Sequence, residues 1–149
     1  EAARLLGVAA LRDVTDLDVA LDKLPNPFIQ RRVRHVVTEN ARVLEAVHVL
    51  RQGRVADLAP LLDSSHESMR TDFQITVPQV DLAVEVARAS GAIGARMTGG
   101  GFGGCIIAVV PAGEAERVGS EIASSFAAAG YGQPMYFTAV PSVGAERLL

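Results

Sequence analysis

The chain has 149 residues, of which 49% are hydrophobic and 21% charged, and its formal net charge at pH 7 is −3. This length suits a single domain, and the weakly acidic balance argues against electrostatic capture of nucleic acid. No apolar run reaches the roughly 18 residues that a membrane span needs. The single cysteine, Cys105, cannot form an internal disulfide, and we expect no signal peptide. We therefore expect a cytoplasmic protein.

Two short helices are predicted at the amino terminus. The stretch "EAARLLGV" (1–8) has the pattern of a helix tail closed by Gly7. Because it begins inside an element, we expect the chain to be a fragment of something longer. A second helix is predicted over 16–25, capped at its start by Thr15 or Asp16 and stopped by a proline.

The clearest predicted helix covers residues 28–51. Its apolar residues recur at helical spacing, at Ile29, Val33, Val36, Val37, Leu44, Val47 and Leu50. Asn40 lies on the same stripe, either as a satisfied polar group against a neighbouring helix or as a residue that points toward a site. Basic residues gather near the start of this helix, at Arg31, Arg32, Arg34 and His35. We interpret this basic run as the solvated side of the helix.

Two more helices are expected before the pattern changes, over roughly 54–70 and 77–90. Thr76 and Gln79 fit a capping box for the second of them, and Gly91 ends it. Strands are then predicted at "AIGARMT" (92–98) and "CIIAVV" (105–110). A helix over 114–130 and a last strand over 134–140 complete the chain. The order predicts an α+β domain, an antiparallel sheet backed by helices.

A glycine-rich loop joins the first two predicted strands, with glycine at five of the six positions 99–104. A dinucleotide fingerprint needs a helix after the glycines, but a strand follows here. A Walker A loop needs a lysine, and none is near. Two readings remain, a mobile turn and a phosphate cover of the protein-kinase kind, in which the backbone approaches a ligand closely. Five glycines cost conformational entropy on folding, which favours the functional loop.

Several other polar residues invite a functional interpretation. Asp63, Ser64, Ser65 and His66 suggest a hydrolase triad, but no nucleophile elbow accompanies them, so capping and hydrogen bonding are the default roles. His35 and Glu39 lie four apart on a helix as a metal pair would, but no third ligand suggests itself, and a structural role is favoured. Ser65 or His66 remains a candidate for facing a cleft.

Three further residues lie close to the loop in the sequence, and each has an expected role. Arg96, next to the loop in a predicted strand, is expected to pair with Asp72 or Asp81. The alternative is that it faces a cleft and contacts a phosphate or another domain. Cys105 is expected to be a small buried thiol. Phe102, at the loop tip, is either a lid against a ligand or a plug in the core.

The loop sequence "GARMTGGGFGGC" (94–105) resembles the third motif of the galactokinase family, within the galacto-, homoserine, mevalonate and phosphomevalonate kinase (GHMP) superfamily. The resemblance spans essentially the whole chain. Other segments that are similar to this family, in its order, are "AARLLGV" (2–8), "RRVRHVVTENARVLEAV" (31–47), "SSHESMRTDF" (64–73), "VPQVDLAVEVA" (77–87) and "PSVGAERL" (141–148).

The resemblance implies that residues 1–149 are one domain, similar to the carboxy-terminal half of a two-domain sugar kinase and ferredoxin-like in fold. In such a kinase, the γ-phosphoryl group of ATP passes to the anomeric hydroxyl of galactose. The amino-terminal half, absent here, would hold the catalytic residues and most of the ATP and magnesium site. We therefore expect no catalytic residue and no metal ligand in this chain. Its phosphate loop would be Thr98, Gly99, Gly100, Gly101, Phe102, Gly103 and Gly104.

The expected partners are the amino-terminal domain, galactose and ATP, with no nucleic acid and no membrane. The chain alone is predicted to be inactive. Two other functions stay open: a kinase for a different sugar, and a non-catalytic relative that senses galactose or ATP. The surface that would face the missing half is also expected to be apolar and to support dimerisation.

Overall fold

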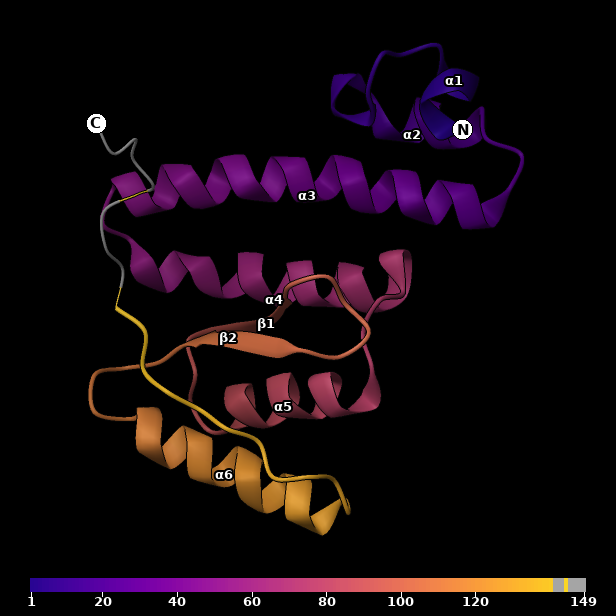
Figure 1. Cartoon of the computed structure of the whole chain (residues 1–149). Helices are drawn as coiled ribbons and strands as arrows, with labels where there is room; N and C mark the ends of the chain where they lie inside the picture. Colours follow the sequence, from indigo (N-terminus) through magenta and orange to yellow (C-terminus); the bar gives the residue numbers. More distant parts are fainter. Residues whose placement is uncertain (141–143, 145–149) are drawn as a thin grey trace, which may run out of the picture.

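Helices and a small sheet alternate in layers in this protein (Figure 1). The computed structural model describes residues 1–140 and Gly144. The elements, in chain order, are α1 (Ala2–Leu6), η1 (Leu11–Asp13), α2 (Leu17–Asp22), α3 (Pro27–Arg51), η2 (Val55–Asp57), α4 (Leu58–Ser68), η3 (Met69–Phe73), α5 (Pro78–Ala89), β1 (Gly94–Thr98), β2 (Cys105–Val109) and α6 (Ala115–Ala128). In Figure 1, α3 and α4 lie on one side of the hairpin, and α5 and α6 lie on the other. No helix of the described part is long and apolar enough to span a membrane.

Capping side chains explain where α2 and α3 begin. The side chain of Asp16 accepts a hydrogen bond from the Val19 N–H at 3.1 Å, which confirms it as the cap of α2. Asn26 caps α3 in the same way, with Pro27 at the first helical position. The 25-residue helix α3 then runs unbroken, as its hydrophobic periodicity predicts.

The helix predicted over 54–70 is divided into three parts. A 3₁₀ turn (η2) precedes α4, and η3 is a single π turn that ends where Gln74 adopts left-handed backbone angles. The capping box predicted for α5 is wrong. Val77 occupies the cap position, and the Thr76 hydroxyl lies 3.3 Å from the Asp81 carboxylate instead.

The strands β1 and β2 form an antiparallel pair in which Gly94 lies opposite Val109 and Thr98 opposite Cys105. Ala95 and Met97 are fully buried and pack toward α5. The face of β1 that points away from α5 lies on α4. The corresponding face of β2 is open to solvent. Cys105 is therefore exposed, and the prediction of a buried thiol is wrong.

The last strand predicted, over 134–140, does not form. This segment has no ladder partner in the described part of the chain, and a strand cannot exist without one. The Tyr136 hydroxyl instead donates to Glu116 on α6 at 2.7 Å, and Met135 and Phe137 are exposed. The α+β class and the antiparallel sheet backed by helices are confirmed. The order α5–β1–β2–α6 corresponds to the centre of the βαββαβ ferredoxin-like order. The segment "PSVGAERL" (141–148), one of those on which the family resemblance rests, lies outside the described residues apart from Gly144.

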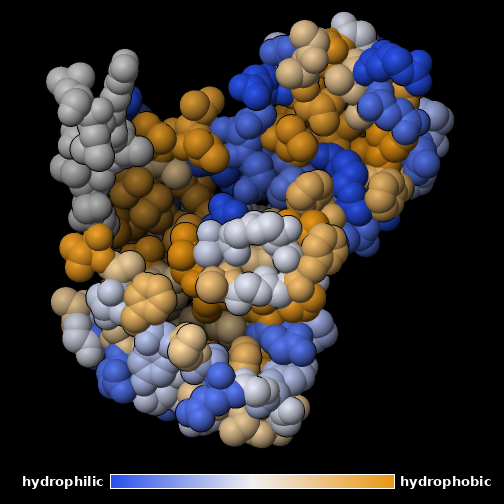
Figure 2. Space-filling view, in the orientation of Figure 1, coloured by the Kyte–Doolittle hydropathy of each residue, from blue (hydrophilic) through white to orange (hydrophobic). Residues whose placement is uncertain are grey.

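The apolar stripe predicted for α3 is buried only in part. Val33 and Val49 are buried, but Leu44 is 72% exposed and Asn40 faces solvent. The predicted packing of Asn40 against a neighbouring helix is therefore not seen, and the alternative, that it points toward a site, stays a prediction. Figure 2 shows hydrophobic side chains at the surface over the carboxy-terminal part of this helix.

Candidate functional site: the glycine loop and its support

The glycine loop (residues 99–104) closes the β1–β2 hairpin, and most of it is open. Added Cβ atoms at Gly99, Gly100 and Gly103 would meet no atom within 4 Å. Gly103 also has a φ of 131°, which L side chains rarely adopt. The backbone amides of these residues can therefore be approached closely from outside, as a phosphate-facing loop requires.

The loop tip is attached to the rest of the domain at Ile75. The N–H of Phe102 donates to the Ile75 carbonyl at 2.6 Å. A Cβ added at Gly101 would come within 2.8 Å of the Ile75 Cβ, so this glycine is required by packing.

Phe102 is 75% exposed, which excludes the core-plug interpretation, and the lid role stays a prediction. Its φ of 59° is unusual for a bulky residue and costs about 1 kcal/mol. Strain of this kind persists only where the surrounding structure imposes it, and it is concentrated at functional sites.

Glu39 on α3 is the hub of a charge cluster below the loop. Its carboxylate accepts from the Ser65 hydroxyl at 2.6 Å, pairs with Arg42, and lies 3.7 Å from the Arg96 guanidinium. Burial alone would raise the pKa of Glu39. The hydrogen bonds from Ser65 and Arg42 and the two positive charges outweigh burial and hold that pKa below its usual value.

This cluster decides three of the sequence predictions. Arg96 is paired, as expected, but with Glu39 rather than with Asp72 or Asp81. Ser65 is 2% exposed and bound to Glu39, so it presents no surface to a cleft in this structure. His35 and Glu39 each bond to another side chain, His35 to Ser68 and Glu39 to Ser65. Among the described residues no group of three or more His, Cys, Asp or Glu side chains is arranged to hold a metal ion.

His66 joins α4 to β1 and α5. Its Nδ1 accepts from the Met97 N–H at 3.3 Å, and its Nε2 lies 3.2 Å from an Asp81 carboxylate oxygen. The acceptor role of Nδ1 places the proton of the neutral ring on Nε2. Burial lowers the pKa of His66, which favours this neutral form. Asp63, Ser64 and His66 form no hydrolase triad, because the polar partners of His66 are Met97 and Asp81 and Asp63 pairs with Arg88 at 2.9 Å.

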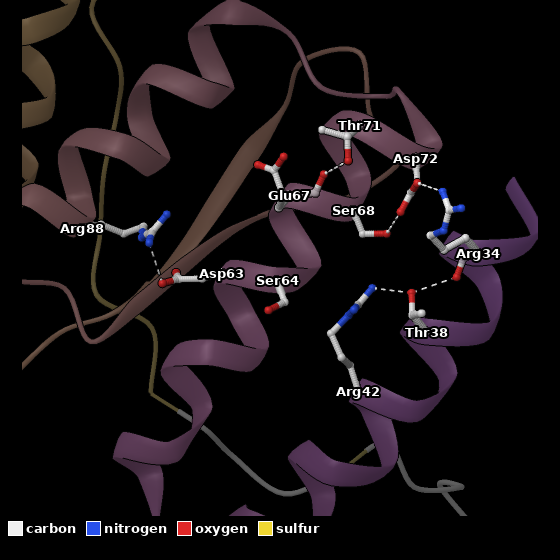
Figure 3. Close-up of a pocket in the computed structure, with 10 residues that line it drawn as sticks. All are labelled: Arg34, Thr38, Arg42, Asp63, Ser64, Glu67, Ser68, Thr71, Asp72 and Arg88. Atoms are coloured by element: carbon white, nitrogen blue, oxygen red, sulfur yellow. Dashed lines mark hydrogen bonds and ion pairs between the residues drawn. The ribbon is translucent and has the colours of Figure 1, made fainter. Parts of the chain in front are cut away.

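A polar hollow of about 480 Å³ lies between α3, α4, η3 and α5 (Figure 3). Three arginines reach it, and each is paired with a carboxylate: Arg34 with Asp72, Arg42 with Glu39 and Arg88 with Asp63. No residue of the glycine loop lines this hollow. Because its cations are internally compensated, we treat it as part of the structural support.

The basic run at the start of α3 is the feature whose role the sequence did not reveal. Arg32 donates to the Asp72 carbonyl and stacks on Phe28, while His35 is buried against the Phe73 ring. These side chains contact η3, so the predicted solvated face is wrong. The spacing of Arg32, His35, Glu39 and Arg42, three or four residues apart, places them on one face and was the available signal.

Comparisons with known proteins show which family this chain belongs to. A family pattern described as "GHMP kinases C terminal" matches residues 46–128, more than half of the chain.

The chain belongs to the GHMP kinase C-terminal family.

Among the relatives of this GHMP kinase domain, a galactokinase of Streptomyces coelicolor is 50% identical over 99% of the chain and 39% of its own length. A galactokinase of Pasteurella multocida is 53% identical over 85% of the chain and 34% of its own length. A crystal structure of Lactococcus lactis galactokinase complexed with galactose superposes with a TM-score of 0.79, at 30% identity, over 83% of this chain and 33% of that one. The chain thus spans little more than a third of the relatives that it matches.

Proposed function

We propose that the chain is the carboxy-terminal domain of a galactokinase and that residues 1–149 form a single domain. In the complete enzyme, the γ-phosphoryl group of ATP would be transferred to the anomeric hydroxyl of galactose. The relatives named above are galactokinases, which supports galactose over another sugar. The observation that carries the proposal is the open glycine loop of a GHMP kinase domain. A cytoplasmic location remains part of the proposal.

The residues of the loop fit a nucleotide phosphate. ATP supplies the transferable phosphoryl group when bound, and this chain supplies backbone N–H donors over 99–104 that would face its oxygens. Gly100 has room for close approach, and the exposed Phe102 ring at the tip would cover the site and exclude water. The described residues offer no magnesium cluster, so we assign magnesium and the catalytic base to the amino-terminal domain.

A chimera tests the proposal directly. The segment of the Streptomyces coelicolor galactokinase that aligns with this chain is replaced by residues 1–149, and ATP-dependent phosphorylation of galactose is measured. We expect activity from the chimera and none from the chain alone. A folded chimera that binds galactose but does not phosphorylate it would contradict the proposal that this chain serves as the carboxy-terminal domain of a galactokinase.

Gly100→Ala in the chimera separates loop function from folding. Because Gly100 has ordinary φ and free space around it, we expect alanine to change the free energy of unfolding by less than about 0.5 kcal/mol. We also expect kcat/KM to fall by about tenfold or more, since the added methyl obstructs the ligand.

Gly132→Ala is the matched control, because Gly132 also has ordinary φ and no atom within 4 Å of an added Cβ. It should leave both stability and kinetics unchanged. Equal kinetics for both variants would show that Gly100 does not face the phosphates.

A further inference from the structure

The position of the glycine loop depends on the backbone of Ile75. The carbonyl of Ile75 accepts the Phe102 N–H, and its side chain blocks the space beside Gly101. Gly99, Gly100 and Gly103 have open space instead of packing neighbours. A displacement of Ile75 would therefore carry the loop tip with it.

Ile75 is placed by the π turn η3. Its N–H donates to the Met69 carbonyl at 3.1 Å, across a left-handed Gln74 with a φ of 58°. This hydrogen bond closes the turn, so the geometry of Met69–Phe73 determines where the Ile75 carbonyl points. Single π turns of this kind occur frequently at functional sites.

Side chains of α3 and α4 hold η3 in place through a cluster that we call the Asp72 cluster: Arg34, His35, Ser68, Asp72 and Phe73. The Asp72 carboxylate accepts from Arg34 at 3.3 Å and from the Ser68 hydroxyl at 3.1 Å. Since the Ser68 proton points to Asp72, the His35 Nδ1–H, 3.0 Å away, donates to Ser68. The His35 ring also stacks on Phe73, with centroids 4.4 Å apart.

We propose that the Asp72 cluster is a positioning device for the glycine loop, acting through η3 and Ile75. The polar partners of Asp72 and Arg34 lie on α3, α4 and η3 and not in the loop, so Asp72 and Arg34 are positioning residues. The role in phosphoryl transfer rests on the proposed function, whereas the mechanical coupling to the loop does not. In Figure 3 the carboxylate of Asp72 on η3 faces Arg34 on α3, which shows where the connection is made.

Arg34→Gln is the variant that tests the coupling with the least risk to folding, because this side chain is 43% exposed. Arg88→Gln is its matched control. That arginine is 51% exposed and also paired with one carboxylate, at 2.9 Å, but its ion pair joins α5 to α4 rather than to η3. A second pair, Asp72→Asn with Asp63→Asn, removes the opposite charge of each ion pair.

Hydrogen exchange of the Phe102 amide in the 149-residue chain provides a readout independent of activity. We expect Arg34→Gln and Asp72→Asn to speed this exchange by about tenfold, because the acceptor on Ile75 becomes mobile. The two control variants should leave it unchanged. Unchanged exchange in Arg34→Gln would overturn the proposal, as would equal acceleration by Arg88→Gln.

The KM for ATP of the chimera provides the functional readout. We expect Arg34→Gln to raise it severalfold without changing the KM for galactose, whereas partial unfolding would lower kcat alone. Faster exchange with an unchanged KM for ATP would retain the coupling but overturn its role at the phosphates. An inactive parent chimera would contradict the proposed function. The exchange result would still decide whether the Asp72 cluster is coupled to the glycine loop.

Discussion

Glu39 shows how one side chain joins three elements. It lies on α3, accepts a hydrogen bond from α4 through Ser65, and neutralises Arg96 on β1. Its low pKa means that it stays ionised at neutral pH, where Arg42 and Arg96 need a counter-charge. Removing this carboxylate would leave its partners unpaired, and that loss costs more stability than the ion pairs themselves contribute.

Glu39→Ala is expected to lower the free energy of unfolding by about 2–4 kcal/mol, because two partly buried guanidinium groups and Ser65 lose their partner. Urea unfolding followed by circular dichroism measures the loss. Glu45→Ala on the exposed side of the same helix is the control, with an expected change below about 0.5 kcal/mol. Equal losses for both variants would contradict the hub role.

At the scale of elements, two buried histidines connect the helices to their neighbours. His35 links α3 to η3, and His66 links α4 to β1 and α5. Burial lowers the pKa of each ring below the ordinary value of 6.5. The neutral rings are compatible with these contacts, whereas protonation would place a charge in a poorly solvated position.

The stability of the domain should therefore fall as the pH falls from 7 to 5. In this range the unfolded chain binds protons at His35 and His66, whose ordinary pKa is 6.5, while the folded chain binds fewer because burial lowers both pKa values. Unfolding then takes up protons, and the free energy of unfolding decreases toward acid. Urea titrations at several pH values measure the slope.

Replacing His35 or His66 with Gln should flatten this dependence, whatever its effect on absolute stability. His48→Gln, which removes an exposed histidine on α3, should leave the slope unchanged. A slope that persists without His35 and His66 would assign the acid sensitivity to other groups.

At the scale of the whole molecule, the hairpin lies between two helical layers (Figure 1). Toward α5 and α6 the contact is made by apolar side chains such as Ala95 and Val118. Toward α4 it is a close backbone approach, where an added Cβ on Gly94 would lie 2.9 Å from the Ala59 Cα. Backbone atoms cannot move aside as a flexible side chain can.

Gly94→Ala is accordingly expected to destabilise the domain by about 1–3 kcal/mol, because α4 and β1 must separate to admit the methyl group. The urea midpoint of unfolding provides the measurement, and Gly132→Ala serves again as the unstrained control. A Gly94→Ala midpoint equal to that of the parent would show that the two layers can adjust without loss.

Local signals were sufficient to predict most of the elements. The periodicity of α3, the acidic cap of α2 and the glycine run between two β-branched stretches each depend on residues close in sequence. The loop of the candidate site was predictable for the same reason, since its glycines are consecutive in the chain. The π turn η3 was not predicted, because contacts from α3 hold it in place.

By itself, the sequence determined the α+β class, the positions of α3, α5 and α6, and a glycine loop between two strands. Only the tertiary structure decided that Arg96 pairs with Glu39, that Cys105 is exposed and that 134–140 forms no strand. These outcomes depend on which distant groups meet in space. Periodicity and caps report the conformation of neighbouring residues, whereas an ion pair, a covered face or a strand partner is supplied by another part of the fold.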